Sequence, residues 1–560
     1  MSDDLQPAGP FRPVDHQPPL PRERLIVEEA PDEEAVPLDV VFVGGGPAGL
    51  AGAIELARLA REDGGAGGEL GDLEIGVMEK AAELGEHCLS GAVVDPRAFE
   101  ELFPGIDPSD FPLRGPVEKE AVYLLTGSRA IRIPTPPTMK NHGNRVASIC
   151  EIVRWLGDRA EEVGVNLFPG FPVDSLLVEG DRVTGVRTTP SGLDRDGSAV
   201  GGDYMPAMDL SARVTVLSEG TRGTLTQAWL EWQGVGAENP QIYALGVKEL
   251  WETKRPLDRV IHTLGWPLPT DAFGGSFMYP MGENLVALGL VVGLDYRDAR
   301  LDVHQLLQEI KLHPLFRPRL EGGEMVEWGG KTIPEGGWWS LPERRHGGGC
   351  VVVGDAAGYV DVPSLKGIHY AMHSGILAAR AIFRALKADD VSEAGLRSYT
   401  ESVDESYIAD DLYRTRNMRL AFKDGFWAGG AKATVMTLTG GAFPGGRPEI
   451  PEDAAEEREL GPDSPGFRPD GTLTFSKVDA VFKSGNTTRD DIPSHLVVGR
   501  DVPAEVAELY VHMCPAGVYE REGEKLVVNA PNCIDCKATD VLGPRWTPRE
   551  GGSGPGYRRM

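Results

Sequence analysis

The chain has 560 residues, with 85 acidic and 56 basic side chains and a formal net charge of −29. This charge repels phosphates and argues against a nucleic-acid partner. A chain of this length exceeds one compact core, so we expect two to four domains.

Residues 1–37 open the chain with a segment rich in proline and acidic side chains. The segment lacks the apolar stretch of a signal peptide and therefore predicts a disordered tail. No uncharged apolar run in the sequence approaches the length that spans a bilayer. We therefore expect a protein that stays in the cytoplasm.

A glycine-rich turn follows the first predicted strand, residues 39–43, and precedes a predicted helix over 48–61. In its G-x-G-x-x-G pattern, Gly44 permits the tight turn, Gly46 lets the backbone approach a pyrophosphate, and Gly49 allows close packing of helix on strand. The helix N-terminus would present N–H groups and a positive dipole end to phosphates. An ordinary glycine-rich turn is the alternative.

A second predicted strand, residues 73–79, ends in Glu79, which is placed to accept hydrogen bonds from ribose hydroxyls. Glu79 lies further from the glycines than is usual, and the glycine-rich insert 63–72 accounts for the extra length. Strand, glycine turn, helix, second strand and terminal acid together predict a dinucleotide site.

The identity of that dinucleotide is indicated by a later strand, residues 350–353, which ends at Gly354 and Asp355. A long helix then follows, opened by Lys366, Gly367 and Ile368. This strand–loop–helix resembles the second FAD motif of the glutathione-reductase and aromatic-hydroxylase flavoproteins. Asp355 would bind the ribityl or pyrophosphate region, and the helix N-terminus would face the pyrimidine ring of the flavin, where its dipole stabilises negative charge.

Two further features agree with FAD. Residues 214–219 predict a strand that ends at Gly220, as in the third nucleotide-contacting strand of the same superfamily. Arg145 precedes apolar residues at helical spacing and matches that superfamily's arginine-led helix near the FAD; a solvated cation at a helix start is the alternative. No second G-x-G-x-x-G follows a strand, so we expect no resident NAD(P)H domain.

Three of the six cysteines gather near the C-terminus: Cys514, Cys533 and Cys536. They follow an acidic run, 452–459, and a proline- and glycine-rich stretch, 461–469, that predicts a linker. In a cytosolic chain this clustering predicts metal or cluster ligation rather than disulfides. A four-iron cluster needs four ligands, but Thr539 stands where a ferredoxin-like C-x-x-C-x-x-C motif has its last cysteine.

Five interpretations of the cysteine site stay open. The three cysteines could hold a three-iron cluster, Asp535 or Asp540 could ligate a fourth iron, or that iron could carry water or hydroxide. The site could also be empty, or it could hold structural zinc with one further ligand.

Long stretches of the chain resemble one family, the electron transfer flavoprotein:ubiquinone oxidoreductases, in its bacterial form. They include VVFVGGGPAGLAGAIELARL, HCLSGAVVDPRAFEELFP, HTLGWPLPTDAFGGSFMYP, VPSLKGIHYAMHSGILAARAIF and NCIDCK, and the likeness extends over about residues 38–560. The resemblance implies an enzyme that takes electrons from electron transfer flavoprotein. It would pass them through FAD and a [4Fe-4S] cluster to a membrane quinone, either ubiquinone or menaquinone.

The resemblance also implies a fold and a set of site residues. The fold is α/β (α+β overall), with a Rossmann-like FAD-binding domain of the glutathione-reductase/aromatic-hydroxylase type, a quinone-binding insertion and a C-terminal ferredoxin-like iron–sulfur domain. The implied boundaries are 38–230 for the first part of the FAD-binding domain, 231–340 for the quinone-binding region, 341–460 for the second part of the FAD-binding domain with a helical membrane-contact region, and 461–560 for the iron–sulfur domain.

Individual residues match the family's motifs as well. Gly274 and Gly275 match its quinone-contacting glycines, with an ordinary turn or bulge as the alternative. Ser90 and Gly91 match a loop close to the flavin ring. The three clustered cysteines match three cluster ligands, and because Thr539 replaces the fourth, a [3Fe-4S] cluster is the alternative to [4Fe-4S].

Membrane contact is a further implication of the resemblance. The family attaches to the membrane without spanning it, here at the inner face of the cell membrane. The matching segment, 419–443, has aromatic and small residues, but Lys423, Asp424 and Lys432 interrupt it. Residues 89–103 are a second candidate, and segments packed on the protein's own core are the alternative for both.

Two other functions compete with this interpretation. One is an FAD-dependent reductase or hydroxylase of the same superfamily, which does not need the cysteine module. The other is an electron-carrier or docking protein that binds FAD and has a degenerate cluster site.

Overall fold

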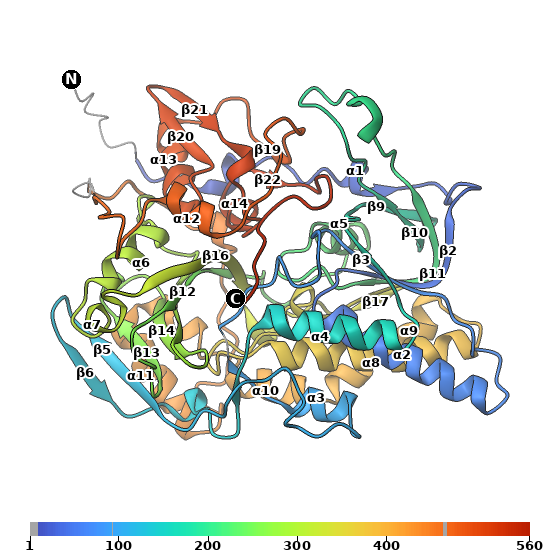
Figure 1. Cartoon of the computed structure of the whole chain (residues 1–560), viewed down its shortest axis with the longest axis horizontal. Helices are drawn as coiled ribbons and strands as arrows, with labels where there is room; N and C mark the ends of the chain where they lie inside the picture. The colour runs from blue at the N-terminus through green and yellow to red at the C-terminus, as the bar shows by residue number, and fades with distance from the viewer. Residues whose placement is uncertain (1–8, 92, 463–466) are drawn as a thin grey trace.

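The computed structural model describes residues 9–91, 93–462 and 467–560. Two large β-sheets form its frame, and helices cover them (Figure 1). The nine-stranded sheet contains, in spatial order, β1 (Ile26–Val27), β9 (Val173–Glu179), β10 (Arg182–Thr188), β11 (Asp209–Leu217), β2 (Val36–Val43), β3 (Ile75–Glu79) and β8 (Asn166–Pro169), with β18 (Cys350–Val352) beside β11 and β17 (His346–Gly347) beside β18. The seven-stranded sheet contains β16 (Glu324–Pro334), β12 (Tyr243–Glu252), β15 (Leu285–Gly293), β14 (Gly274–Pro280), β13 (Val260–Gly265), β5 (Glu120–Leu125) and β6 (Ala130–Ile133).

The centre of the nine-stranded sheet is parallel: β18, β11, β2, β3 and β8 all run in one direction. Two long helices, α2 (Pro47–Gly65) and α8 (Ile368–Lys387), pack against each other beside it. They approach closely because a Cβ at Gly375 would lie only 2.1 Å from the backbone oxygen of Ala48. The predicted α/β class is confirmed, and the close crossing brings the N-termini of both helices to the same edge of the sheet.

The seven-stranded sheet packs against α6 (Val303–Lys311) and α7 (Arg317–Leu320). A fully buried ion pair joins α6 to β12, with Lys311 Nζ 2.9 Å from Glu249 Oε1. Trp251 Nε1 and Gln308 Nε2 also donate hydrogen bonds to this carboxylate. Breaking such a pair leaves a buried charge without compensation, so the pair fixes the position of the helix on the sheet.

A C-terminal module of short elements packs against β16 (Figure 1). It contains α12 (Lys477–Lys483), β19 (Leu496–Val497), α13 (Ala504–Met513), β20 (Tyr519–Glu522), β21 (Lys525–Val528), α14 (Ala538–Leu542) and β22 (Arg545–Trp546). The chain then returns to the middle of the molecule and ends at Met560, which is fully buried. Its carbonyl oxygen accepts hydrogen bonds from Ile149 N and Ser148 Oγ, both at 3.0 Å, at the start of α4 (Ile149–Glu162).

The prediction of a disordered tail over residues 1–37 is wrong for residues 9–37. Phe11 is buried in the core of the seven-stranded sheet and Leu25 in that of the nine-stranded sheet. The backbones of Phe11 and Arg458 exchange two hydrogen bonds, and β1 pairs in parallel with β9. Composition misled here because two apolar anchors and backbone pairing order a segment whose average is polar.

The remaining helices cover the sheets and their edges. They are α1 (Arg22–Leu25), α3 (Arg97–Leu102), α5 (Thr224–Trp232), α9 (Glu393–Asp404), α10 (Tyr407–Thr415) and α11 (Phe426–Leu438). In the part of the chain that the structure describes, no helix is both long and apolar enough to cross a membrane. The proposal of membrane contact by residues 89–103 is wrong for the apolar residues Val94 and Phe99, which are buried in the first sheet's core. Residues 463–466 of the predicted linker lie outside the described residues.

Candidate functional site

A cavity of about 310 Å³ lies where the parallel strands β2, β11 and β18 end. Open α/β sheets bind nucleotides at the carboxyl ends of their strands. Residues from both sheets line this cavity. The cofactor residues predicted from sequence that line it are Gly44, Gly46, Glu79, Ser90, Gly91, Gly220, Gly354, Asp355, Lys366, Gly367 and Ile368.

In the glycine turn after β2, two glycines have no room for a side chain, and the third faces the open cavity. Gly44 has a φ of +115°, and a Cβ there would lie 2.4 Å from Ser218 O. A Cβ at Gly49 would lie 2.2 Å from Gly44 O, so Gly49 brings α2 against the strand end. Gly46, the N-cap of α2, has no protein atom within 4 Å of its Cβ position and lines the cavity. The open space beside an uncapped helix N-terminus fits a pyrophosphate.

Two backbone hydrogen bonds hold the carboxylate of Glu79 at the end of β3. Its carboxylate accepts hydrogen bonds from the backbone N–H groups of Gly45 and Ala81, both at 2.9 Å. A carboxylate has about four acceptor positions, and these bonds fill two of them. The geometry therefore suits a carboxylate that also accepts hydrogen bonds from ligand hydroxyls.

The other end of the cavity is formed by the start of α8. Gly367 is its N-cap and has no side-chain capping bond, and the first-turn N–H groups of a helix have no partner within the helix. Lys366 Nζ donates to Asn141 Oδ1 at 2.9 Å, and burial lowers the pKa of Lys366 to about 8. Burial raises the pKa of Asp355 to about 6, opposed by the charge of Lys331. Both helix N-termini thus meet the cavity beside titratable side chains.

Arg145 does not reach this cavity, and its predicted place at the head of a helix is wrong. It lies in the short strand β7 (Arg145–Val146), and its Nε donates to Arg114 O at 3.0 Å. The helix begins later because Ser148 caps α4 by accepting a hydrogen bond from Glu151 N. Ile149, rather than the arginine, lines the cavity from this segment.

Gly274 and Gly275 also lie outside the residues that line the cavity. They begin β14, where a Cβ at Gly274 would lie 2.1 Å from Val291 O and one at Gly275 would lie 2.5 Å from Thr263 O. Val291 itself lines the cavity. The two glycines therefore stand at the start of β14, before its cavity-lining residues Phe277 and Tyr279, and they let neighbouring strand backbones approach each other.

The three clustered cysteines are buried, and their thiols are close enough to affect one another's pKa. Burial raises the pKa of Cys536, and the other two thiols raise it further. Burial likewise raises the pKa of Cys533 to about 12. Cys536 O accepts a hydrogen bond from Thr332 N at 2.9 Å, and Thr332 lines the cavity. A single backbone hydrogen bond therefore connects a candidate cluster ligand, Cys536, to a residue of the candidate flavin site, Thr332.

The acids suggested as a fourth ligand are already engaged. Asp540 accepts hydrogen bonds from Arg222 Nε at 2.7 Å, Gln227 Nε2 at 3.1 Å and Trp546 N at 3.0 Å. Asp535 binds Lys80 through one oxygen and Arg549 and Trp546 through the other. Thr539 Oγ1 lies 2.5 Å from Tyr519 OH. Basic side chains therefore compensate the charge of both buried carboxylates.

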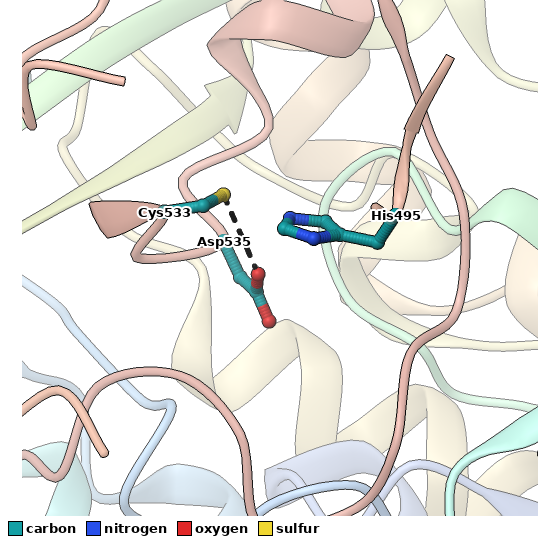
Figure 2. A group of neighbouring side chains, drawn as sticks. All are labelled: His495, Cys533 and Asp535. Carbon is teal, nitrogen blue, oxygen red and sulfur yellow. Dashed lines mark hydrogen bonds between the residues drawn. The ribbon is translucent and has the colours of Figure 1, made fainter. Parts of the chain in front are cut away.

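A histidine that the sequence did not indicate, His495, lies beside Cys533 and could also act as a ligand. Figure 2 shows the His495 ring directed toward Cys533 and Asp535, and the ligand atoms of the three residues all lie within 4.8 Å of one another. Cys533 Sγ donates to Asp535 Oδ1 at 3.7 Å. His495 was missed because it belongs to no motif and lies far from the Cys-x-x-Cys in sequence.

Several cavity residues from the seven-stranded sheet were missed for the same reason. They are Lys248, Phe277, Tyr279, Lys331 and Thr332. Each lies on a strand of the second sheet, β12, β14 or β16, and no motif marks it in the sequence. Lys331 Nζ also donates to Asp535 O at 3.2 Å, so it bridges the cavity and the cysteine module.

Comparisons with known proteins agree with both parts of the site. The family described as "ETF-QO, ubiquinone-binding" matches residues 243–333, and "Electron transfer flavoprotein-ubiquinone oxidoreductase, 4Fe-4S" matches residues 471–558. The solved structure of a geranylgeranyl bacteriochlorophyll reductase-like protein from Thermoplasma acidophilum has a TM-score of 0.55 at 19% identity, covering 72% of this chain and 92% of its own. This likeness shows the fold.

Relatives of known family cover nearly the whole chain. The mitochondrial electron transfer flavoprotein-ubiquinone oxidoreductase of Oryza sativa is 39% identical, covering 94% of this chain and 94% of its own. The Sus scrofa protein of the same name is 36% identical, covering 93% and 89%. "Probable electron transfer flavoprotein-ubiquinone oxidoreductase" of Acinetobacter baylyi is 36% identical, covering 94% and 99%. The chain belongs to the electron transfer flavoprotein-ubiquinone oxidoreductase family.

Proposed function

We propose that this protein accepts electrons from reduced electron transfer flavoprotein and passes them, through FAD and an iron–sulfur cluster, to a membrane quinone. The observation that carries the proposal is the hydrogen bond between Thr332 N and Cys536 O, because it joins the cavity to the cysteine module. When bound, FAD takes up one or two electrons and an iron–sulfur cluster takes up one.

The residues of the cavity would hold FAD at its two ends. Gly44, Gly46 and the α2 N-terminus would bind the pyrophosphate, and Glu79 would bind ribose hydroxyls. The start of α8, with Lys366, would lie against the flavin ring and favour negative charge there. Cys514, Cys533 and Cys536 would hold the cluster.

The protein contributes a positive boundary between the two candidate cofactor sites. Lys80, Lys331 and Arg549 surround Asp535 at this boundary. A single carboxylate cannot balance three cations, so this region favours a bound group that gains negative charge on reduction.

Gly274 and Gly275 would mark the quinone side of the cavity. They follow Phe273, whose ring lies 5.1 Å from that of Phe422, with the Arg419 guanidinium 4.1 Å from the Phe273 ring centre. Phe422 belongs to the short helix η6 (Leu420–Asp424), which leads into α11. A quinone that enters beside α11 would therefore meet the start of β14.

We further propose that α11 attaches the protein to the inner face of the cell membrane. Trp427, Leu438 and Phe443 are exposed by 69%, 82% and 65% in this segment. The charges that interrupt it are paired: Lys423 contacts Asp295 and Glu456, and Lys432 contacts Asp424. Exposed apolar side chains beside paired charges suit an interfacial helix that does not span the bilayer.

Leu438→Ser is expected to weaken binding to lipid vesicles by about 10- to 150-fold, because burying a leucine contributes about 1.5–3 kcal/mol. Co-sedimentation with vesicles of mixed zwitterionic and anionic lipid measures this. Phe482→Ser is the matched control, since Phe482 is 83% exposed on α12 of the C-terminal module. Equal losses in both variants would contradict attachment through α11.

Anaerobic reoxidation tests the proposed function itself. Reduced electron transfer flavoprotein is mixed with catalytic amounts of the holoenzyme and a water-soluble ubiquinone or menaquinone analogue. The flavin absorbance of the donor should return only when both enzyme and quinone are present. Reduction of the enzyme without onward transfer to any quinone would favour a carrier or docking protein instead.

A further inference from the structure

We propose that the imidazole of His495 is the fourth protein ligand of the iron–sulfur cluster bound by Cys514, Cys533 and Cys536. The inference deepens the proposed function and rests on it, because it assumes that a cluster occupies the cysteine module. It assigns to a histidine on a separate segment the place that a ferredoxin-like motif gives to residue 539.

The other candidate protein ligands already have partners. Thr539 pairs its hydroxyl with Tyr519 OH at 2.5 Å. The carboxylate of Asp540 accepts hydrogen bonds from Arg222 and Gln227. The carboxylate of Asp535 accepts hydrogen bonds from Lys80, Arg549 and Trp546.

The remaining cysteines of the chain lie outside the module. Cys150 and Cys350 are buried in hydrophobic clusters, and Cys88 lines the candidate flavin cavity. None of the three shares the cluster of core residues that contains Cys514, Cys533 and Cys536. A fourth thiolate for the site is therefore absent among the described residues.

Unlike these residues, His495 is buried with no hydrogen-bond partner for its ring within the described structure. Only 2% of the residue is exposed, and neither ring nitrogen has a hydrogen-bond partner within the described structure. Its ligand atom lies within 4.8 Å of those of Cys533 and Asp535 (Figure 2). A buried nitrogen without a partner is costly, and iron would satisfy it.

The backbone holds the ring in place. His495 O accepts hydrogen bonds from both Thr547 N at 2.9 Å and Thr547 Oγ1 at 3.0 Å. The ring packs edge-on against Trp546, whose indole N–H donates to Asp535. Because Asp535 lies within the Cys-x-x-Cys turn, the histidine and the cysteine turn are positioned by one connected set of contacts.

A histidine ligand would change the charge of the cluster. Neutral imidazole replaces a thiolate, which removes one negative charge, and clusters with histidine ligands have higher potentials than those with cysteine alone. Arg549 and Lys80, on the same side of the site, act in the same direction. The cluster would therefore be easier to reduce than one with four cysteines.

The direct test uses the unaltered holoenzyme, purified without oxygen and reduced with dithionite. We expect four irons per chain and a pulsed-EPR nitrogen coupling that changes when the protein is labelled with [15N]histidine. A cluster signal without any histidine coupling would overturn the inference and leave the proposed function intact. A holoenzyme that retains no iron after reconstitution would overturn both.

Variants test the same point by a second route. His495→Ala should give an EPR signal in the oxidised state and lose one iron, as a three-iron cluster does. His495→Cys should keep four irons, lose the nitrogen coupling and lower the midpoint potential of the cluster. Thr539→Cys added to His495→Ala should restore the fourth iron. If His495→Ala keeps four irons and the potential of the parent protein, His495 is not a ligand.

Discussion

Gly46→Val should weaken the binding of FAD while the chain still folds. The Cβ position of Gly46 meets no protein atom within 4 Å and opens into the cavity, so a valine would occupy space that the ligand needs. Overpacking of this kind costs about 1–3 kcal/mol, which corresponds to about 5- to 150-fold weaker binding. The flavin absorbance per chain, measured across a titration of the apoprotein with FAD, gives the change in affinity.

Gly65→Val is the matched control for this substitution. Gly65 is the last residue of the same helix, is exposed, and has no protein atom within 4 Å of its Cβ position. Valine there should leave FAD binding unchanged. If Gly46→Val kept full FAD affinity, the pyrophosphate would not lie at the N-terminus of α2.

Arg222→Met should lower the free energy of unfolding by about 3–5 kcal/mol, the usual cost of breaking a buried ion pair by removing one partner. Arg222 follows β11, and its Nε donates to Asp540 Oδ2 at 2.7 Å and to Asp540 O at 3.0 Å. Asp540 is completely buried, so its charge would stay in the interior without the guanidinium. Because this pair ties the cysteine module to the segment that follows β11 of the nine-stranded sheet, loss of cluster absorbance should precede loss of flavin in a urea titration.

Arg213→Met provides the comparison for Arg222→Met. Arg213 lies on β11 and pairs with Asp389, whose side chain is 91% exposed. Surface pairs contribute about 0–1 kcal/mol, so this variant should stay near the parent protein. Similar stability losses in both variants would mean that the Arg222–Asp540 pair does not hold the module in place.

Local sequence predicted the parts of the site that depend on backbone conformation. A turn that needs a positive φ at Gly44, a helix N-terminus at Gly46 and a second helix start at Gly367 all depend on neighbouring residues, so motif spacing identified them. The same reasoning failed for Arg145, because the Ser148 cap determines where the helix begins. It also failed for the N-terminal segment, where single apolar anchors outweigh a polar average.

The α/β class, the glycine turn after β2 and the three clustered cysteines could all be predicted from local patterns in the chain. Which distant residues lie beside them is visible only in the folded chain: Lys331 and Thr332 from the second sheet, Arg222 beside Asp540, and His495 beside Cys533. These contacts join segments far apart in the chain, so each residue follows only the periodicity of its own strand or loop. Their partners depend on how the two sheets and the C-terminal module pack, and this packing cannot be predicted from local sequence patterns.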